Sequence, residues 1–151
     1  MNLLEALKAD HEEAKSLLAL VLDAPDTKGR TEAFKTFKAA MTAHSRAEEK
    51  VFYQRMEKTE AGKDKALKGE TEHEIVDRLM DELSRSRSKD SDRWTARCSV
   101  LQELIEHHVE EEESTFFELA KQEFDAETLD RMGEQFENEK GRRHTPRHAA
   151  E

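Results

Sequence analysis

Apolar residues recur every three or four positions along most of this chain, and the pattern stops where proline, glycine or a short polar run intervenes. A stripe with this period is typical of an α-helix that buries one face. The breaks fall at Pro25, at Gly62 and in the stretch 84–92, which is rich in Ser, Arg and Lys. The pattern therefore predicts five helices, over about residues 2–23, 29–58, 63–87, 91–122 and 125–140.

The lengths of these segments predict how they pack. Helices of 20–30 residues measure about 30–45 Å at 1.5 Å per residue, and short connections force neighbouring helices to run antiparallel. We therefore predict an all-α protein, an up-down-up-down four-helix bundle over residues 1–140 with a short C-terminal fifth helix. Residues 141–151 have little to bury and are predicted to be a disordered tail.

Composition and charge exclude several classes of protein. The chain has 151 residues, 25 Lys and Arg against 35 Asp and Glu, a formal net charge of −10 and a mean hydropathy of −0.97. An acidic balance argues against nucleic acid and anionic membranes as main partners. The chain has no long apolar run, its N-terminus is charged, and its single cysteine, Cys98, excludes an internal disulfide. These features predict a cytoplasmic protein that does not bind membranes.

A histidine interrupts the apolar stripe of each long helix near the middle of its length. These residues are His11, His44, His73 and His108. On the second and fourth helices a glutamate follows one turn later, as Glu48 and Glu112. Residues four apart share a helix face, so each His/Glu pair presents a nitrogen and an oxygen to the same part of the core.

The arrangement also repeats along the chain. His44-x3-Glu48-Glu49-x2-Phe52 matches His108-x3-Glu112-Glu113-x2-Phe116 position for position. Two helical hairpins with one ligand pattern predict a pseudo-twofold bundle that brings its ligands together at the centre. Four imidazoles and two carboxylates suit two first-row transition metals, because imidazole binds Fe, Zn, Cu and Ni and a carboxylate can bridge two ions.

A structural role is the alternative for each residue taken singly. A lone histidine on an apolar face is more often a satisfied core residue, and a His-x3-Glu pair can be an ion pair on a solvated face. Burial of an unpartnered carboxylate, however, costs several kcal/mol, and a bound metal removes that cost. The combination therefore favours a metal site.

In these residues the chain resembles the hemerythrin-like (HHE) cation-binding domains, which carry one His, then His-x3-Glu, then one His, then His-x3-Glu on four successive helices. The likeness covers about residues 2–122. It implies a non-haem di-iron centre with two Fe ions, although Zn fits the same ligands. The histidines would be terminal ligands and the glutamates would bridge the irons. The implied metal ligands are His11, His44, Glu48, His73, His108 and Glu112.

One position departs from the oxygen-carrying hemerythrins, which have His-x3-His on the third helix. Here the residue four after His73 is Asp77. Three alternatives follow for this position: Asp77 is a weak ligand, a water takes its place, or His107 supplies the ligand from the fourth helix. An iron with an open coordination position is less typical of a dedicated oxygen carrier. We expect a protein that binds oxygen, peroxide or nitric oxide for sensing, scavenging or iron handling, with a peroxide-dismutating enzyme or a metal-stabilised interaction module as alternatives.

Other residues are expected to have structural roles. Cys98 is interpreted as a packing residue, and Tyr53 as a packing residue with a hydrogen-bonding role near the site as the alternative. Of the run 110–113 only Glu112 is expected to point inward. His144 and His148 fall in the predicted tail and are excluded as ligands.

Overall fold

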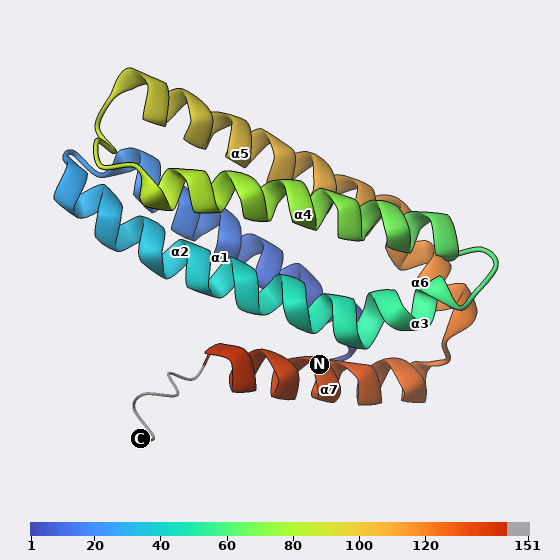
Figure 1. Ribbon diagram of the computed structural model, residues 1–151. Coiled ribbons are helices and arrows are strands. Elements are labelled where there is room, and N and C mark those ends of the chain that lie inside the picture. Colours follow the sequence, from blue (N-terminus) through green and yellow to red (C-terminus); the bar gives the residue numbers. More distant parts are fainter. Residues whose placement is uncertain (145–151) are drawn as a thin grey trace.

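The computed structural model describes residues 1–144, which are helical apart from short connections (Figure 1). The elements are α1 (Leu3–Asp23), α2 (Thr27–Glu48), η1 (Glu49–Tyr53), α3 (Gln54–Glu57), α4 (Lys63–Arg85), α5 (Asp92–Glu111), η2 (Glu112–Phe116), α6 (Phe117–Glu123) and α7 (Ala126–His144). The η segments are single π-helical stretches, through which α2 continues into α3 and α5 into α6. Residues 1–144 contain no strand, so the all-α prediction is confirmed.

Side-chain caps explain where the long helices begin. Asn2 accepts a hydrogen bond from the backbone N–H of Glu5, whose carboxylate accepts one from Asn2 in return. Asp26 accepts from Gly29 N–H at 2.8 Å, so α2 begins at Thr27, slightly before the predicted start. Each cap satisfies a donor that would lack a partner in the first helical turn.

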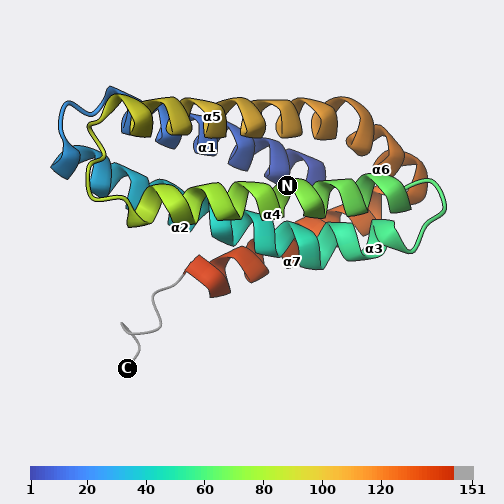
Figure 2. The same cartoon turned by 45° about the horizontal axis from the view of Figure 1, so that its top comes forward.

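The four long helical segments lie side by side as a helical bundle, with α7 across one side of it (Figures 1 and 2). α7 packs on α1 and α2. Its inward side chains Leu129, Met132 and Phe136 are buried. A Cβ on Gly133 would stand 2.4 Å from the carbonyl oxygen of Met1, so only glycine allows this close approach to the N-terminus.

Two apolar clusters form the core, one toward each end of the bundle. One contains Leu7, Phe52 and Phe116, and the other contains Phe37, Trp94 and Leu101. On each long helical segment, the candidate ligands lie where the residues of one cluster give way to those of the other. The apolar core thus encloses a polar centre on both sides.

One detail of the predicted organisation differs in the structure. α7 continues to His144, so residues 141–144 extend the helix and are not part of a tail. The rest of the predicted tail, 145–151 with His148, lies outside the described residues. None of the helices within residues 1–144 is long and apolar enough to cross a membrane.

Candidate metal centre

Four histidines converge on two glutamates at the middle of the bundle. His11 Nε2 lies 3.2 Å from Glu112 Oε1, and His108 Nε2 lies 3.4 Å from Glu112 Oε2. His73 Nε2 and His44 Nε2 lie 3.2 and 3.6 Å from Glu48 Oε1. All six side chains are buried. The structure therefore brings all six predicted ligands together.

The six residues form two overlapping sets. One is His11, His44 and Glu48, and the other is Glu48, His73 and His108; within each set the ligand atoms lie within 4.8 Å of one another. Glu48 belongs to both sets, and Glu112 turns one oxygen to His11 and the other to His108. Each carboxylate thus faces both histidine pairs, as two ions held side by side would require.

A second carboxylate stands behind every histidine, on the ring nitrogen that faces away from the centre. The Nδ1 atoms of His11, His44, His73 and His108 lie 2.6, 2.9, 2.6 and 2.7 Å from Glu113, Asp10, Glu49 and Glu72, respectively. A carboxylate at Nδ1 keeps the proton on that nitrogen and leaves the Nε2 lone pair directed inward. This is the usual arrangement around metal-binding imidazoles.

The outer carboxylates follow the internal repeat. Asp10 and Glu72 directly precede the single histidines, and Glu49 and Glu113 directly follow the inner glutamates. Asp10 and Glu72 each bond to a histidine of the other helix in the same half. Glu49 and Glu113 each bond to a histidine in the opposite half. The expectation that only Glu112 of the run 110–113 points inward is therefore incomplete, because Glu113 bonds to His11.

Several inward atoms have no hydrogen-bond partner among the described residues. They are Nε2 of His11 and of His73, both oxygens of Glu48, and Oε1 of Glu112. The short contacts between them lack hydrogen-bond geometry. An unsatisfied buried polar atom costs about 1–3 kcal/mol, and native proteins contain few of them. A concentration of such atoms with nitrogen and carboxylate chemistry fits a bound transition metal.

The charges of the centre are strongly coupled. Burial acts to lower the pKa of His44, but the negative charge of Glu48 and the hydrogen bond to Asp10 outweigh it and raise the pKa to about 10. The pKa of His108 is likewise raised, against the effect of burial, by its contacts with Glu112 and Glu72. Without a cation, protons on these rings balance the carboxylates, and a bound metal would displace them.

Tyr53 adds a hydroxyl to the centre. It donates a hydrogen bond of 2.5 Å to Glu112 Oε2 and lies 3.2 Å from His108 Nε2. Burial, together with the charges of Glu112 and Glu48, raises the pKa of Tyr53 well above its usual value, so the group stays protonated. A Cβ on Gly69 would stand 2.7 Å from the Tyr53 ring, so glycine makes room for it. Of the two roles considered for Tyr53, the structure therefore shows the hydrogen-bonding one.

The hydroxyl breaks the pseudo-twofold symmetry. Phe117 occupies the position equivalent to Tyr53 in the repeat, nine residues after His108. The Phe117 ring stacks on His11 as the Tyr53 ring stacks on His73. Comparison of the two repeats could have singled out Tyr53.

The structure places the two proposed extra ligands away from the centre. Asp77 Oδ2 accepts a hydrogen bond of 2.7 Å from Arg46. The side chain of His107 is 69% exposed and lies 3.5 Å from Glu111.

Comparisons with known proteins agree with this geometry. Residues 2–120 match the family described as the hemerythrin HHE cation binding domain, and the chain belongs to this family. A curated relative, a "DNA nickase" of Nostoc sp. (strain PCC 7120 / SAG 25.82 / UTEX 2576), is 24% identical over 142 residues. The match covers 94% of this chain but 40% of that protein, so the chain spans about two fifths of the relative's length. No solved structure matches the chain. Family and geometry together indicate a cation-binding helical bundle.

Proposed function

We propose that this protein holds two iron ions in an up-down-up-down four-helix bundle. His11 and His44 would be the terminal ligands of one ion and His73 and His108 those of the other, with Glu48 and Glu112 as bridges. The supporting observation is that each buried carboxylate faces both histidine pairs, and that both oxygens of Glu48 and Oε1 of Glu112 lack hydrogen-bond partners among the described residues. Zinc fits the same donor set, and metal analysis distinguishes the two.

We further propose that the centre binds oxygen, peroxide or nitric oxide. Bound iron would supply an open coordination position and redox chemistry. A cavity of about 20 Å³ lies against the centre, lined among others by Tyr53, Gly69, His108 and Glu112. That volume holds one or two water-sized molecules, which suits ligands of two heavy atoms. Tyr53 places a proton donor at the wall of this cavity.

The test is titration of the iron-loaded protein with each small molecule, followed by absorption spectroscopy. A spectral change that saturates at a fixed ratio to iron is expected for at least one of them. A spectrum unchanged by oxygen, peroxide and nitric oxide would contradict the proposed binding and leave a metal that serves only the fold.

Peroxide dismutation is a second candidate, and the hydroxyl of Tyr53 is the observation that favours it. A protonated group hydrogen-bonded to Glu112 can hold and return a proton beside the cavity. The expected result is peroxide turnover above that of the same amount of free iron, reduced in Tyr53→Phe. Nicking, the activity named for the Nostoc relative, belongs to a protein of which this chain covers 40%, and an identity of 24% does not transfer that activity to this chain.

A further inference from the structure

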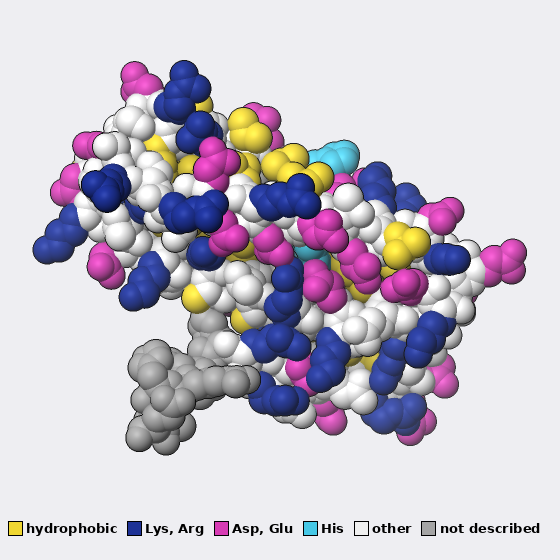
Figure 3. Space-filling model, viewed as in Figure 1, with side chains coloured by type: hydrophobic (Ala, Val, Ile, Leu, Met, Phe, Trp, Pro, Cys, Tyr) yellow, Lys and Arg dark blue, Asp and Glu magenta, His cyan; other side chains and the backbone are white. Residues whose placement is uncertain are grey.

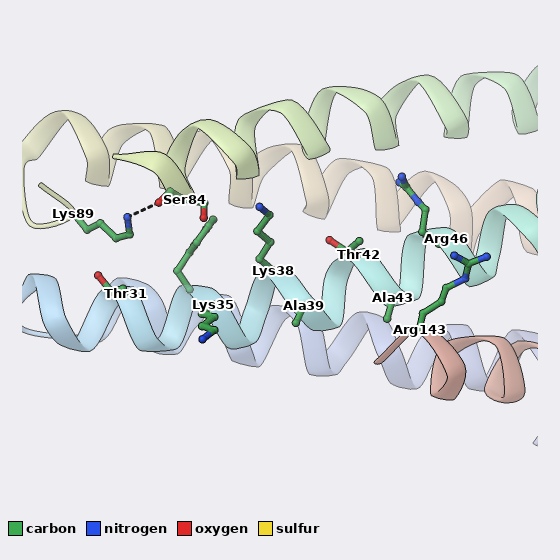
Figure 4. A pocket seen from close by; sticks show the side chains of 11 residues that line it. Thr31, Lys35, Lys38, Ala39, Thr42, Ala43, Arg46, Ser84, Lys89 and Arg143 are labelled. Atoms are coloured by element: carbon green, nitrogen blue, oxygen red, sulfur yellow. Dashed lines mark hydrogen bonds between the residues drawn. The ribbon is translucent and has the colours of Figure 1, made fainter. Parts of the chain in front are cut away.

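A second groove lies away from the metal centre. It has a volume of about 730 Å³ and runs along α2, between the C-terminal end of α4 with its following loop and the last turn of α7. Figure 4 shows Lys38 and Arg46 extending from α2 towards α4, with Thr42 between them and Arg143 reaching in from α7.

The groove is basic in an acidic protein. Its lining includes the five cations Lys35, Lys38, Arg46, Lys89 and Arg143 and no carboxylate, whereas the whole chain carries a net charge of −10. Figure 3 shows Lys and Arg side chains where α2 approaches α7, with Asp and Glu side chains over α4. The net charge of the chain therefore conceals a local surface of opposite sign.

Three of these cations form ion pairs with carboxylates beside the groove, and the most exposed of these partners is Asp81; Arg46 is held by the partly buried Asp77 and Glu49. Lys38 pairs with Asp81 at 2.8 Å, and Arg143 with Glu139 at 3.6 Å. Exposed ion pairs contribute about 0–1 kcal/mol, so an incoming anion can compete with Asp81 for Lys38, and the long 3.6 Å contact of Arg143 is weak as well. Lys35 is exposed, and no described residue pairs with it. Lys89 differs, because the residue is buried and its Nζ donates to the backbone carbonyls of Ser84 and Ser86, which gives it a structural role.

The other polar groups of the groove are hydroxyls. Thr31, Thr42 and Ser84 line it together with the cations. Lysine, arginine and hydroxyl side chains are the groups that contact phosphate oxygens in nucleic-acid complexes. The groove therefore offers hydrogen-bond donors and positive charge, and no carboxylate lines it. Such a lining favours phosphate groups over cationic ligands.

The length of the groove indicates how the phosphates are spaced. Residues 31–46 of α2 border it, which is about 22 Å of helix at 1.5 Å per residue. The phosphates of a free nucleotide are joined directly and reach only part of that length. A stacked single strand rises about 3.4 Å per nucleotide, so about six nucleotides span it.

We propose that this groove binds the sugar–phosphate backbone of single-stranded nucleic acid. Phe34, the aromatic residue in its lining, is 1% exposed and cannot stack with a base, so the binding is independent of sequence. The acidic remainder of the surface opposes broad contact with a duplex, whereas a single strand lies within the basic groove. The net charge alone predicts no nucleic-acid partner, and the proposal departs from that expectation for this groove only.

The test uses the full chain and a fluorescein-labelled dT12 strand, with anisotropy measured from 50 to 200 mM salt. The variant Lys38→Gln/Arg143→Gln removes two groove cations and leaves Arg46, which also bonds to Glu49 beside the centre. The control Lys121→Gln/Arg131→Gln removes two exposed cations that form similar ion pairs elsewhere, with Glu118 and Glu127. Both double variants lower the net charge by the same amount.

We expect dT12 to bind and the groove variant to weaken binding about tenfold at 50 mM salt, with the salt slope reduced by about 1.4, or 0.7 for each lost phosphate contact. The control variant should bind like the parent. Absence of dT12 binding at 50 mM salt, or equal losses in the two variants, would overturn the proposal. It would also be overturned if tripolyphosphate, a duplex of equal length or a poly-glutamate peptide competed as well as unlabelled dT12.

Discussion

Replacement of Asp10 by asparagine tests the outer carboxylates, because it keeps the size of the side chain and removes its charge. Asp10 uses one oxygen to hold His44 Nδ1 at 2.9 Å and the other to accept from Lys140 Nζ at 2.6 Å. Burial alone would raise the pKa of Asp10, but these two partners outweigh it and lower the pKa. Asparagine has one oxygen, so its NH₂ group must face one of the two donors.

The size of the effect follows from these contacts. Loss of a carboxylate behind a metal-binding histidine costs about 10–100-fold in metal affinity, which equals about 1.4–2.7 kcal/mol. We expect Asp10→Asn to fall in this range. The internal repeat predicts a similar loss for Glu72→Gln, since Glu72 holds His108 in the same way.

The assay is anaerobic binding of ferrous iron in competition with a chelator of known affinity. Glu12→Gln is the matched control, because Glu12 lies on the same helix with its side chain 64% exposed and pairs only with Lys15 among the described residues. The control should bind iron like the parent. If Asp10→Asn bound iron as tightly as the control, the outer carboxylates would have no part in metal binding.

Three further predictions concern the surroundings of the centre. Tyr53→Phe should retain the metal but lower the unfolding free energy by about 1–3 kcal/mol in urea titrations, because Glu112 loses a buried donor; unchanged stability would contradict this. Gly69→Ala should cost about 1–3 kcal/mol through its clash with the Tyr53 ring, whereas Gly141→Ala, whose Cβ meets nothing within 4 Å, should cost nothing by the same measurement. In the metal-free protein the pKa of His44 is raised to about 10, against 6.5 in the unfolded chain. Protonated His44 therefore stabilises the fold fully below pH 6.5, and this contribution is lost as the pH rises towards about 10. A urea midpoint that rises over this pH range would contradict the predicted direction.

Much of the centre could be predicted from sequence because helical geometry fixes it. Residues four apart share a face, so His44 and Glu48 had to point the same way, as did His108 and Glu112. Burial of these residues followed from the apolar positions around them. The repeat then indicated that the two halves meet.

The outer groups could not be predicted in the same way. An acidic residue beside a histidine, such as Asp10, is common on a solvated helix face, and only the packing of α1 against α2 directs it to His44. The groove joins α2 to the end of α7, in a stretch where the sequence predicted a tail. Sequence periodicity describes each helix alone and does not specify such contacts between helices.

The most direct test of the central claim is the metal content of the protein after anaerobic loading with ferrous iron and removal of unbound metal. We predict about two irons per chain for the parent and for His107→Ala, whose side chain is exposed, and a clear loss of iron for His44→Ala and Glu112→Ala. Equal iron content in all four proteins, or no iron in the parent, would contradict the assignment of the centre.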